Sequence, residues 1–252
     1  MSTGSAARPI RAVEGNVVES STSSGSSRRA TLATIFTAAT LLSSGSPALA
    51  VVRDVNKEVS SYLPASESLP GFVQYIPGPS KTPSLRAGTV DAANPYQFAL
   101  PSSFTELKIS NTQSGNYCQP RCDEPWTEVA FADPSVGKLE LIVSPLEKFT
   151  PKKKVKIQDL GNPKFLIGRI GNFITGSYLD EDDIVSATEE VKDGLTYYYY
   201  EINAGYAKVG TRSISAVAVK GGLVYLLVAS ASEKQWKQYE GDLKTAVATF
   251  RA

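Results

Sequence analysis

The segment Ser213–Phe250 constrains the fold most strongly, because its pattern predicts a strand, a tight turn, a second strand and a closing helix. Two apolar runs flank Gly221-Gly222, and two residues that tolerate positive φ at this spacing favour a hairpin turn. The second run is apolar on both faces, with Leu223, Tyr225 and Leu227 on one and Val224, Leu226 and Val228 on the other. We therefore predict a central strand that is covered on both sides.

The residues after this strand predict a capped helix. Ser232 and Gln235 have the spacing of a capping box, in which two side chains bond the exposed amides at the start of a helix. One apolar stripe follows at helical spacing, formed by Trp236, Tyr239, Leu243, Val247 and Phe250. A helix laid over a strand pair builds a core, and that core by itself identifies no function.

The rest of residues 94–252 continues with short strands and single helices. The predicted strands are Tyr96–Leu100, Phe104–Ile109, Trp126–Ala132, Leu139–Val143, Ile184–Val191 and Leu195–Ile202. Asp193-Gly194 predicts a second tight turn, and Asn162-Pro163 predicts the start of a helix. The run Tyr197–Tyr200 sends aromatic rings to both faces of the sheet. The sequence therefore predicts an α+β fold, with a mostly antiparallel sheet and helices packed on it.

The composition excludes several function classes. The chain has no histidine, which removes the commonest general base and the usual partner of a nucleophilic Ser or Cys. The balance of 26 basic and 25 acidic residues gives no electrostatic case for nucleic-acid binding, which usually needs a basic stripe. We find neither a carboxylate pair placed for acid–base chemistry nor a glycine-rich phosphate loop after a strand. We therefore expect a protein that is not an enzyme.

The first 50 residues have the composition of targeting segments. Residues 1–27 are rich in Ser, Thr, Ala and Gly, as in a chloroplast transit peptide. Residues 28–50 combine twin arginine, an apolar run too short to cross a bilayer and a small-residue cleavage motif. The residues that carry this second signal are Arg28, Arg29, Ala48 and Ala50. The two segments predict delivery to the chloroplast and then to the thylakoid lumen, with a bacterial export signal as the alternative.

Residues 51–93 contain five prolines and no sustained hydrophobic period. This composition predicts a flexible arm before a folded domain at 94–252. The arm serves either as a simple tether or as a partner-binding segment, with Phe72, Tyr75 and Ile76 as its anchors.

Several blocks of residues 94–252 occur in the order found in a known family. They are Asn94–Phe98, Ser144-Pro145, Ile157–Pro163, Thr196–Glu201 and Ala231–Trp236. With these blocks the chain resembles the PsbP-domain family of the thylakoid lumen. The block Cys118–Trp126 is similar to a cysteine-containing branch of that family, distinct from the oxygen-evolving subunit.

The resemblance implies an α/β/α sandwich and a non-enzymatic role at a photosystem. The chain is then expected to associate, peripherally to the membrane, with lumenal subunits of photosystem I or II as an assembly or stability factor. The family link to the oxygen-evolving complex of photosystem II also implies calcium retention. Histidines that some members use for metal or docking contacts cannot be carried over, because this chain has none.

Cys118 and Cys122 are the two cysteines of the chain. Their spacing is not that of a C-x-x-C redox motif, and the further Cys or His ligands of a zinc site are missing. A structural disulfide, a regulatory disulfide and free thiols all remain open.

Two charged clusters are further candidate sites. Lys152, Lys153, Lys154 and Lys156 form either a solvated loop or a docking surface that steers the chain toward acidic partners. Asp180, Glu181, Asp182 and Asp183 form either a solvated acidic loop or a weak calcium site. Because their spacing is not that of a calcium-binding loop, such a site needs ligands from elsewhere.

Three functions follow as hypotheses. The first is the photosystem-associated assembly or stability factor. The second is a redox-regulated lumenal protein that uses Cys118 and Cys122. The third is a carrier of a small ligand or ion, with a pocket between the sheet and a helix.

Overall fold

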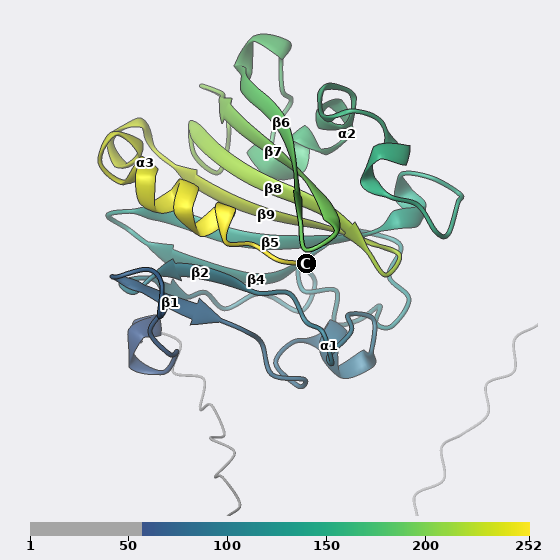
Figure 1. Ribbon diagram of the computed structural model, residues 1–252, viewed down its shortest axis with the longest axis horizontal. Helices are drawn as coiled ribbons and strands as arrows, with labels where there is room; N and C mark the ends of the chain where they lie inside the picture. Colours follow the sequence, from purple (N-terminus) through teal and green to yellow (C-terminus); the bar gives the residue numbers. More distant parts are fainter. Residues whose placement is uncertain (1–56) are drawn as a thin grey trace, which may run out of the picture. The chain divides into compact units, whose positions relative to one another are not determined.

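The computed structural model describes residues 57–252, which contain nine β-strands and three α-helices (Figure 1). The predicted targeting segments, with Arg28, Arg29, Ala48 and Ala50, lie outside the described residues. No helix within residues 57–252 is both long enough and apolar enough to span a bilayer.

Seven strands form the main sheet in the spatial order β3-β4-β5-β9-β8-β7-β6, and every neighbouring pair is antiparallel. The strands are β3 (Thr105–Glu106), β4 (Trp126–Asp133), β5 (Gly137–Pro145), β6 (Ile184–Lys192), β7 (Leu195–Asn203), β8 (Arg212–Lys220) and β9 (Leu223–Ala231). Strand β9 lies fourth of seven, and all nine of its residues are buried. The predicted central strand is confirmed.

The tight turn between β8 and β9 has the predicted geometry. Lys220 pairs with Leu223, so Gly221 and Gly222 alone form the loop, and both have positive φ (62° and 81°). This conformation suits glycine because it has no Cβ to clash with the backbone. Asp193-Gly194 connects β6 to β7 in the same way.

Helix α3 (Glu233–Ala248) covers one face of the sheet (Figure 1). It begins with the predicted capping box, since the Ser232 hydroxyl accepts from the Gln235 N–H and the Gln235 side chain accepts from the Ser232 N–H. From its apolar stripe, Trp236, Leu243 and Val247 are buried against the same core as alternate residues of β9.

The opposite face is covered by α2 (Pro163–Thr175) and the short 3-10 helices η2 (Leu146–Lys148) and η3 (Ile157–Leu160). Asn162 caps α2 as predicted, with Pro163 at its first position. Tyr198 and Tyr200 belong to this second core, whereas Tyr197 belongs to the first. The predicted α+β fold, with helices on both faces of an antiparallel sheet, is confirmed.

Residues 57–93 are an ordered part of the domain, so the expectation of a flexible arm is wrong for them. They form η1 (Val59–Ser61), β1 (Phe72–Tyr75) and α1 (Pro83–Ala87). Strand β1 pairs with β2 (Phe98–Pro101) in a second, two-stranded sheet. Pro83 stands at the first position of α1, where no amide hydrogen is needed, and Phe72, Val73, Tyr75 and Leu85 are buried, so proline content did not indicate a flexible segment.

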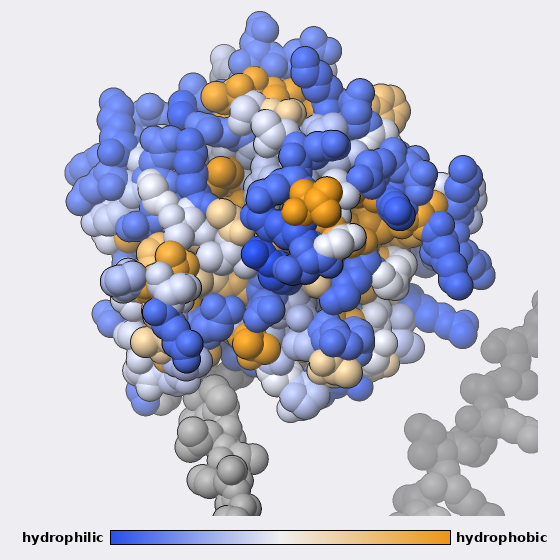
Figure 2. All heavy atoms as spheres, in the orientation of Figure 1, coloured by the Kyte–Doolittle hydropathy of each residue, from blue (hydrophilic) through white to orange (hydrophobic). Residues whose placement is uncertain are grey.

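The proposed anchors of that arm are mostly unavailable to a partner. Phe72 and Tyr75 are buried, and Ile76 is exposed. On the face drawn in Figure 2, apolar side chains lie in small groups among hydrophilic ones, as is ordinary for a protein surface.

Candidate functional site

A disulfide joins Cys118 and Cys122 in the loop between β3 and β4, with the sulfurs 2.01 Å apart. The Cys118 sulfur lies 3.1 Å from the carbonyl oxygen of Gly115. Because a disulfide sulfur carries no hydrogen, this approach is a close contact and not a hydrogen bond. Of the three expectations for this pair, the structure excludes free thiols.

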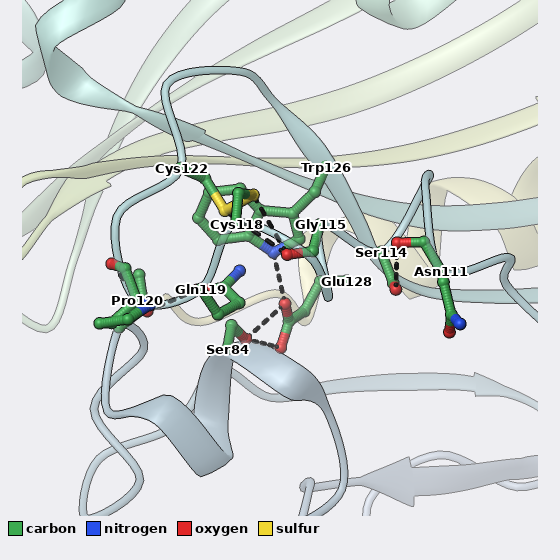
Figure 3. The surroundings of a disulfide bond; sticks show 11 residues. Ser84, Asn111, Ser114, Gly115, Cys118, Gln119, Pro120, Cys122, Trp126 and Glu128 are labelled. Atoms are coloured by element: carbon green, nitrogen blue, oxygen red, sulfur yellow. Dashed lines mark hydrogen bonds between the residues drawn. A yellow bond between two sulfur atoms is a disulfide. The ribbon is translucent and has the colours of Figure 1, made fainter. Parts of the chain in front are cut away.

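The disulfide is enclosed by Gly115 and Trp126 (Figure 3). Gly115 has a φ of 62°, and a Cβ placed on it would lie 3.2 Å from the Cys118 sulfur and 3.3 Å from that of Cys122. Only glycine therefore allows this close approach without strain. The disulfide and the Trp126 ring belong to the core on the α3 side of the sheet.

The disulfide loop is also fastened to the segment that follows α1. The Thr89 hydroxyl lies within hydrogen-bonding distance of the Gln119 side-chain carbonyl and of the Pro120 backbone carbonyl. The position of this loop thus depends on residues 57–93.

A buried carboxylate, Glu128, lies next to the disulfide and is only 3% exposed. Trp126 Nε1 donates to its Oε2 over 2.7 Å, and the Ser84 hydroxyl lies 2.6 Å from both carboxylate oxygens. The hydroxyls of Thr82 and Tyr96 donate to Oε1. The groups that donate to Glu128 are hydroxyls and an indole, so neutral donors stabilise its charge at short range.

A β-bulge aims Glu128 into this site. The pairing of β4 with β5 passes from Thr127 opposite Ile142 to Val129 opposite Leu141, so Glu128 is the extra residue. A bulge re-aims side chains by inserting one residue into a strand. Trp126 and Val129 belong to the same core, although their spacing in a regular strand would place them on opposite faces.

Tyr96 is kept as a hydrogen-bond donor by its surroundings. Burial, and after it the negative charge of Glu128, holds the pKa of the Tyr96 phenol well above its ordinary value. Its hydroxyl therefore remains protonated throughout the physiological range.

A cavity of about 600 Å³ borders Glu128. Its other walls come from η1, the start of α1, β3 and the loop that follows β3. On the wall of β3, Glu106 forms an ion pair with Lys81 over 2.6 Å and accepts a 3.3 Å hydrogen bond from Tyr62. Burial, followed by the charge of Glu106, raises the pKa of Tyr62.

The two charged clusters from the sequence lie elsewhere. The predicted docking residues Lys152, Lys153, Lys154 and Lys156 are exposed in the loop between η2 and η3, and no ion pair within residues 57–252 involves them. Asp180 is the N-cap of the 3-10 helix η4 (Glu181–Asp183), which consists of Glu181, Asp182 and Asp183.

The acidic cluster has a local structural role. The Asp183 carboxylate accepts a 3.0 Å hydrogen bond from the Asp180 N–H. The described residues contain no group of three or more His, Cys, Asp or Glu side chains arranged to hold a metal ion. A calcium ion at Asp180–Asp183 thus needs ligands from outside the segment and stays a prediction.

Sequence reasoning missed Glu128 and its donors. The available signal was a single glutamate inside the apolar strand Trp126–Phe131, a position where an unpaired charge is costly. The donors Thr82 and Ser84 lay in a segment whose composition suggested flexibility.

The fold is an α+β domain with helices on both faces of an antiparallel sheet. Its site is a disulfide-bonded loop beside a buried carboxylate that accepts hydrogen bonds from neutral donors. The sequence model of the PsbP family matches residues 88–252. The chain belongs to the PsbP family.

Two relatives from Arabidopsis thaliana are similar to it. "PsbP domain-containing protein 6, chloroplastic" is 42% identical over 194 residues, which cover 77% of this chain and 73% of the relative. "PsbP domain-containing protein 4, chloroplastic" is 29% identical over 161 residues, covering 62% of this chain and 55% of the relative. The solution structure of cyanobacterial PsbP (CyanoP) from Synechocystis sp. PCC 6803 aligns with a TM-score of 0.44 at 17% identity, over 73% of this chain and 94% of that one.

Proposed function

We propose that this chain is a non-enzymatic protein of the chloroplast thylakoid lumen that associates with photosystem subunits as an assembly or stability factor. Membership of the PsbP family carries the proposal, because the family resemblance implies a role at a photosystem. The names of both relatives contain the word chloroplastic, and the signals predicted in residues 1–50 point to the lumen.

The exposed lysines of the η2–η3 loop are the proposed contact with such a partner. Lys152, Lys153, Lys154 and Lys156 project a local positive charge, which favours encounter with acidic lumenal surfaces. This contact does not require the buried site around Glu128.

Affinity purification of the tagged chain from solubilised thylakoids tests the proposal. We expect subunits of photosystem I or II to be enriched over a purification with an unrelated tagged lumenal protein. Recovery of no photosystem subunit above that control would contradict photosystem association. Recovery of photosystem subunits from assembly intermediates, but not from mature complexes, would identify an assembly factor.

A second function, thiol–disulfide regulation, is favoured by the contacts of the disulfide. The Cys118–Cys122 bond lies beside Trp126, whose indole bonds Glu128 and thereby contacts the network of Thr82 and Ser84. Breaking the bond would loosen the loop at this junction. Differential alkylation and mass spectrometry of the chain from illuminated and dark-adapted thylakoids measures its redox state. An unchanged, fully oxidised pair in both samples would argue against regulation.

A further inference from the structure

The cavity beside Glu128 has the size and lining of a binding site. Its volume of about 600 Å³ falls within the range of small-molecule pockets. It lies between the ordered N-terminal segment, which includes the start of α1, and strands β3 and β4 with the loop after β3.

The acidic groups of the cavity are already satisfied. Glu106 is paired with Lys81 and accepts from Tyr62, while the oxygens of Glu128 accept from surrounding donors. Neither carboxylate is therefore left as an open ligand for a cation, because each has its own donors.

Two basic side chains of the cavity, those of Arg86 and Lys108, have donors that can bind a ligand. Lys108 forms no ion pair within the described part of the chain. Arg86 donates from Nη1 to the Ser80 carbonyl, and a guanidinium carries five N–H donors. Both side chains belong to exposed residues that line the cavity. Lys81, Arg86 and Lys108 outnumber the carboxylates Glu106 and Glu128 in the lining, which gives the cavity an excess of positive charge.

The same cavity has an apolar wall. The residues that contribute it are Pro83, Leu107, Ile109 and Val129. Leu107 is 38% exposed, so part of its side chain is open to a bound molecule. An apolar wall beside a basic rim matches a molecule with an apolar body and an anionic head.

We propose that this cavity binds a small amphipathic organic anion. Its anionic head lies between Arg86 and Lys108, and its apolar body packs on Leu107, Ile109 and Val129. The pairing of charge supplies orientation, and burial of the apolar body supplies affinity. This binding is independent of photosystem association.

Fluorescence titration of the full chain with anilinonaphthalenesulfonate, an amphipathic anion, tests the site. We expect saturable binding that weakens with added salt, and displacement of the probe by octanoate but not by octanol at equal concentration. The Arg86→Gln/Lys108→Gln double variant is expected to raise the Kd about tenfold, which corresponds to two modest charge contacts.

Two further variants locate the site. Lys152→Gln/Lys154→Gln removes the same charge from an exposed loop that does not line the cavity and is expected to leave the Kd unchanged. Leu107→Ser is expected to weaken binding while leaving the folded state intact, because Leu107 is already partly exposed. Absence of saturable binding, equal displacement by octanol and octanoate, or equal affinity of the two double variants would each overturn the proposal.

Discussion

The indole Nε1 of Trp126 donates a 2.7 Å hydrogen bond to the carboxylate of Glu128, while the same indole lies beside the Cys118–Cys122 disulfide (Figure 3). One aromatic side chain thus connects a covalent cross-link to a buried charge. Because Ser84 and Thr82 also donate to that charge, the arrangement fixes the N-terminal segment to the main sheet.

Replacing Glu128 with Gln should destabilise the domain. The amide keeps the shape of the carboxylate but turns an NH₂ group toward hydroxyl and indole donors, so several charge-assisted bonds are lost. We expect a loss of about 2 kcal/mol in the free energy of unfolding, measured by urea denaturation. Glu124→Gln, at an exposed position, is the control and should change stability by less than about 0.5 kcal/mol. Equal effects of the two variants would contradict the role of Glu128.

Removing the disulfide should lower the free energy of unfolding of the domain. The bond closes a loop with a sequence separation of 4, for which the chain-entropy estimate is about 2 kcal/mol. We expect the Cys118→Ser/Cys122→Ser variant to unfold at lower urea and to be insensitive to reductant, whereas the natural chain loses stability on reduction. An unfolding midpoint that reductant leaves unchanged in the natural chain would refute this.

Substitution of Gly115 tests the close packing around the disulfide. In Gly115→Ala the new Cβ meets both sulfurs at 3.2 and 3.3 Å in a backbone conformation that alanine rarely adopts. We expect a loss of about 1–3 kcal/mol, measured by thermal and urea unfolding. Gly78→Ala is the matched control, because no atom lies within 4 Å of its Cβ position and its φ is not in the positive region. A Gly115→Ala variant as stable as Gly78→Ala would show that the contact is relaxed.

Charge reversal of the docking lysines should weaken photosystem association. We expect Lys152→Glu/Lys154→Glu to reduce recovery of photosystem subunits several-fold at low salt and to have little effect at high salt, since screening removes the steering field. Lys234→Glu/Lys237→Glu makes the same charge change at exposed positions of α3 and serves as the control. Unchanged recovery with the first variant would exclude this loop as the contact.

Stability should fall above pH 10. Burial is the leading cause that raises the pKa of seven phenols, those of Tyr62, Tyr75, Tyr96, Tyr197, Tyr198, Tyr200 and Tyr225. Above the ordinary tyrosine pKa of about 10, the unfolded chain releases these protons and the folded chain keeps them, so the free energy of unfolding decreases as pH rises.

Urea midpoints between pH 8 and pH 11 measure this dependence. Tyr225→Phe should make the decline shallower, because it removes one of the phenols that stay protonated on folding. Tyr206→Phe, at a 90% exposed position, should leave the slope unchanged. A stability that is flat through pH 11 would contradict the prediction.

The elements predicted correctly are those with local causes. The β8–β9 turn needs two residues at positive φ, and Gly221-Gly222 supplies them; the caps Asn162 and Ser232 bond amides three residues away. The family blocks, and the apolar residues on both faces of β9, then indicate that these turns and helices belong to one domain with a central sheet. Proline content predicts a flexible segment at residues 57–93, but buried apolar residues between the prolines, such as Phe72, Val73 and Tyr75, hold the segment in the core.

By itself, the sequence determined the α+β sheet, the central hairpin, the capped helices and the family, because turn, cap and periodicity signals act over a few residues. Tertiary structure decided the site. The donors to Glu128 stand 46, 44 and 32 residues away along the chain at Thr82, Ser84 and Tyr96. Only packing of the N-terminal segment on the sheet, together with an unforeseen bulge in β4, brings them to one carboxylate. A buried charge is satisfied by whichever donors the whole fold assembles around it, and no local pattern encodes that set.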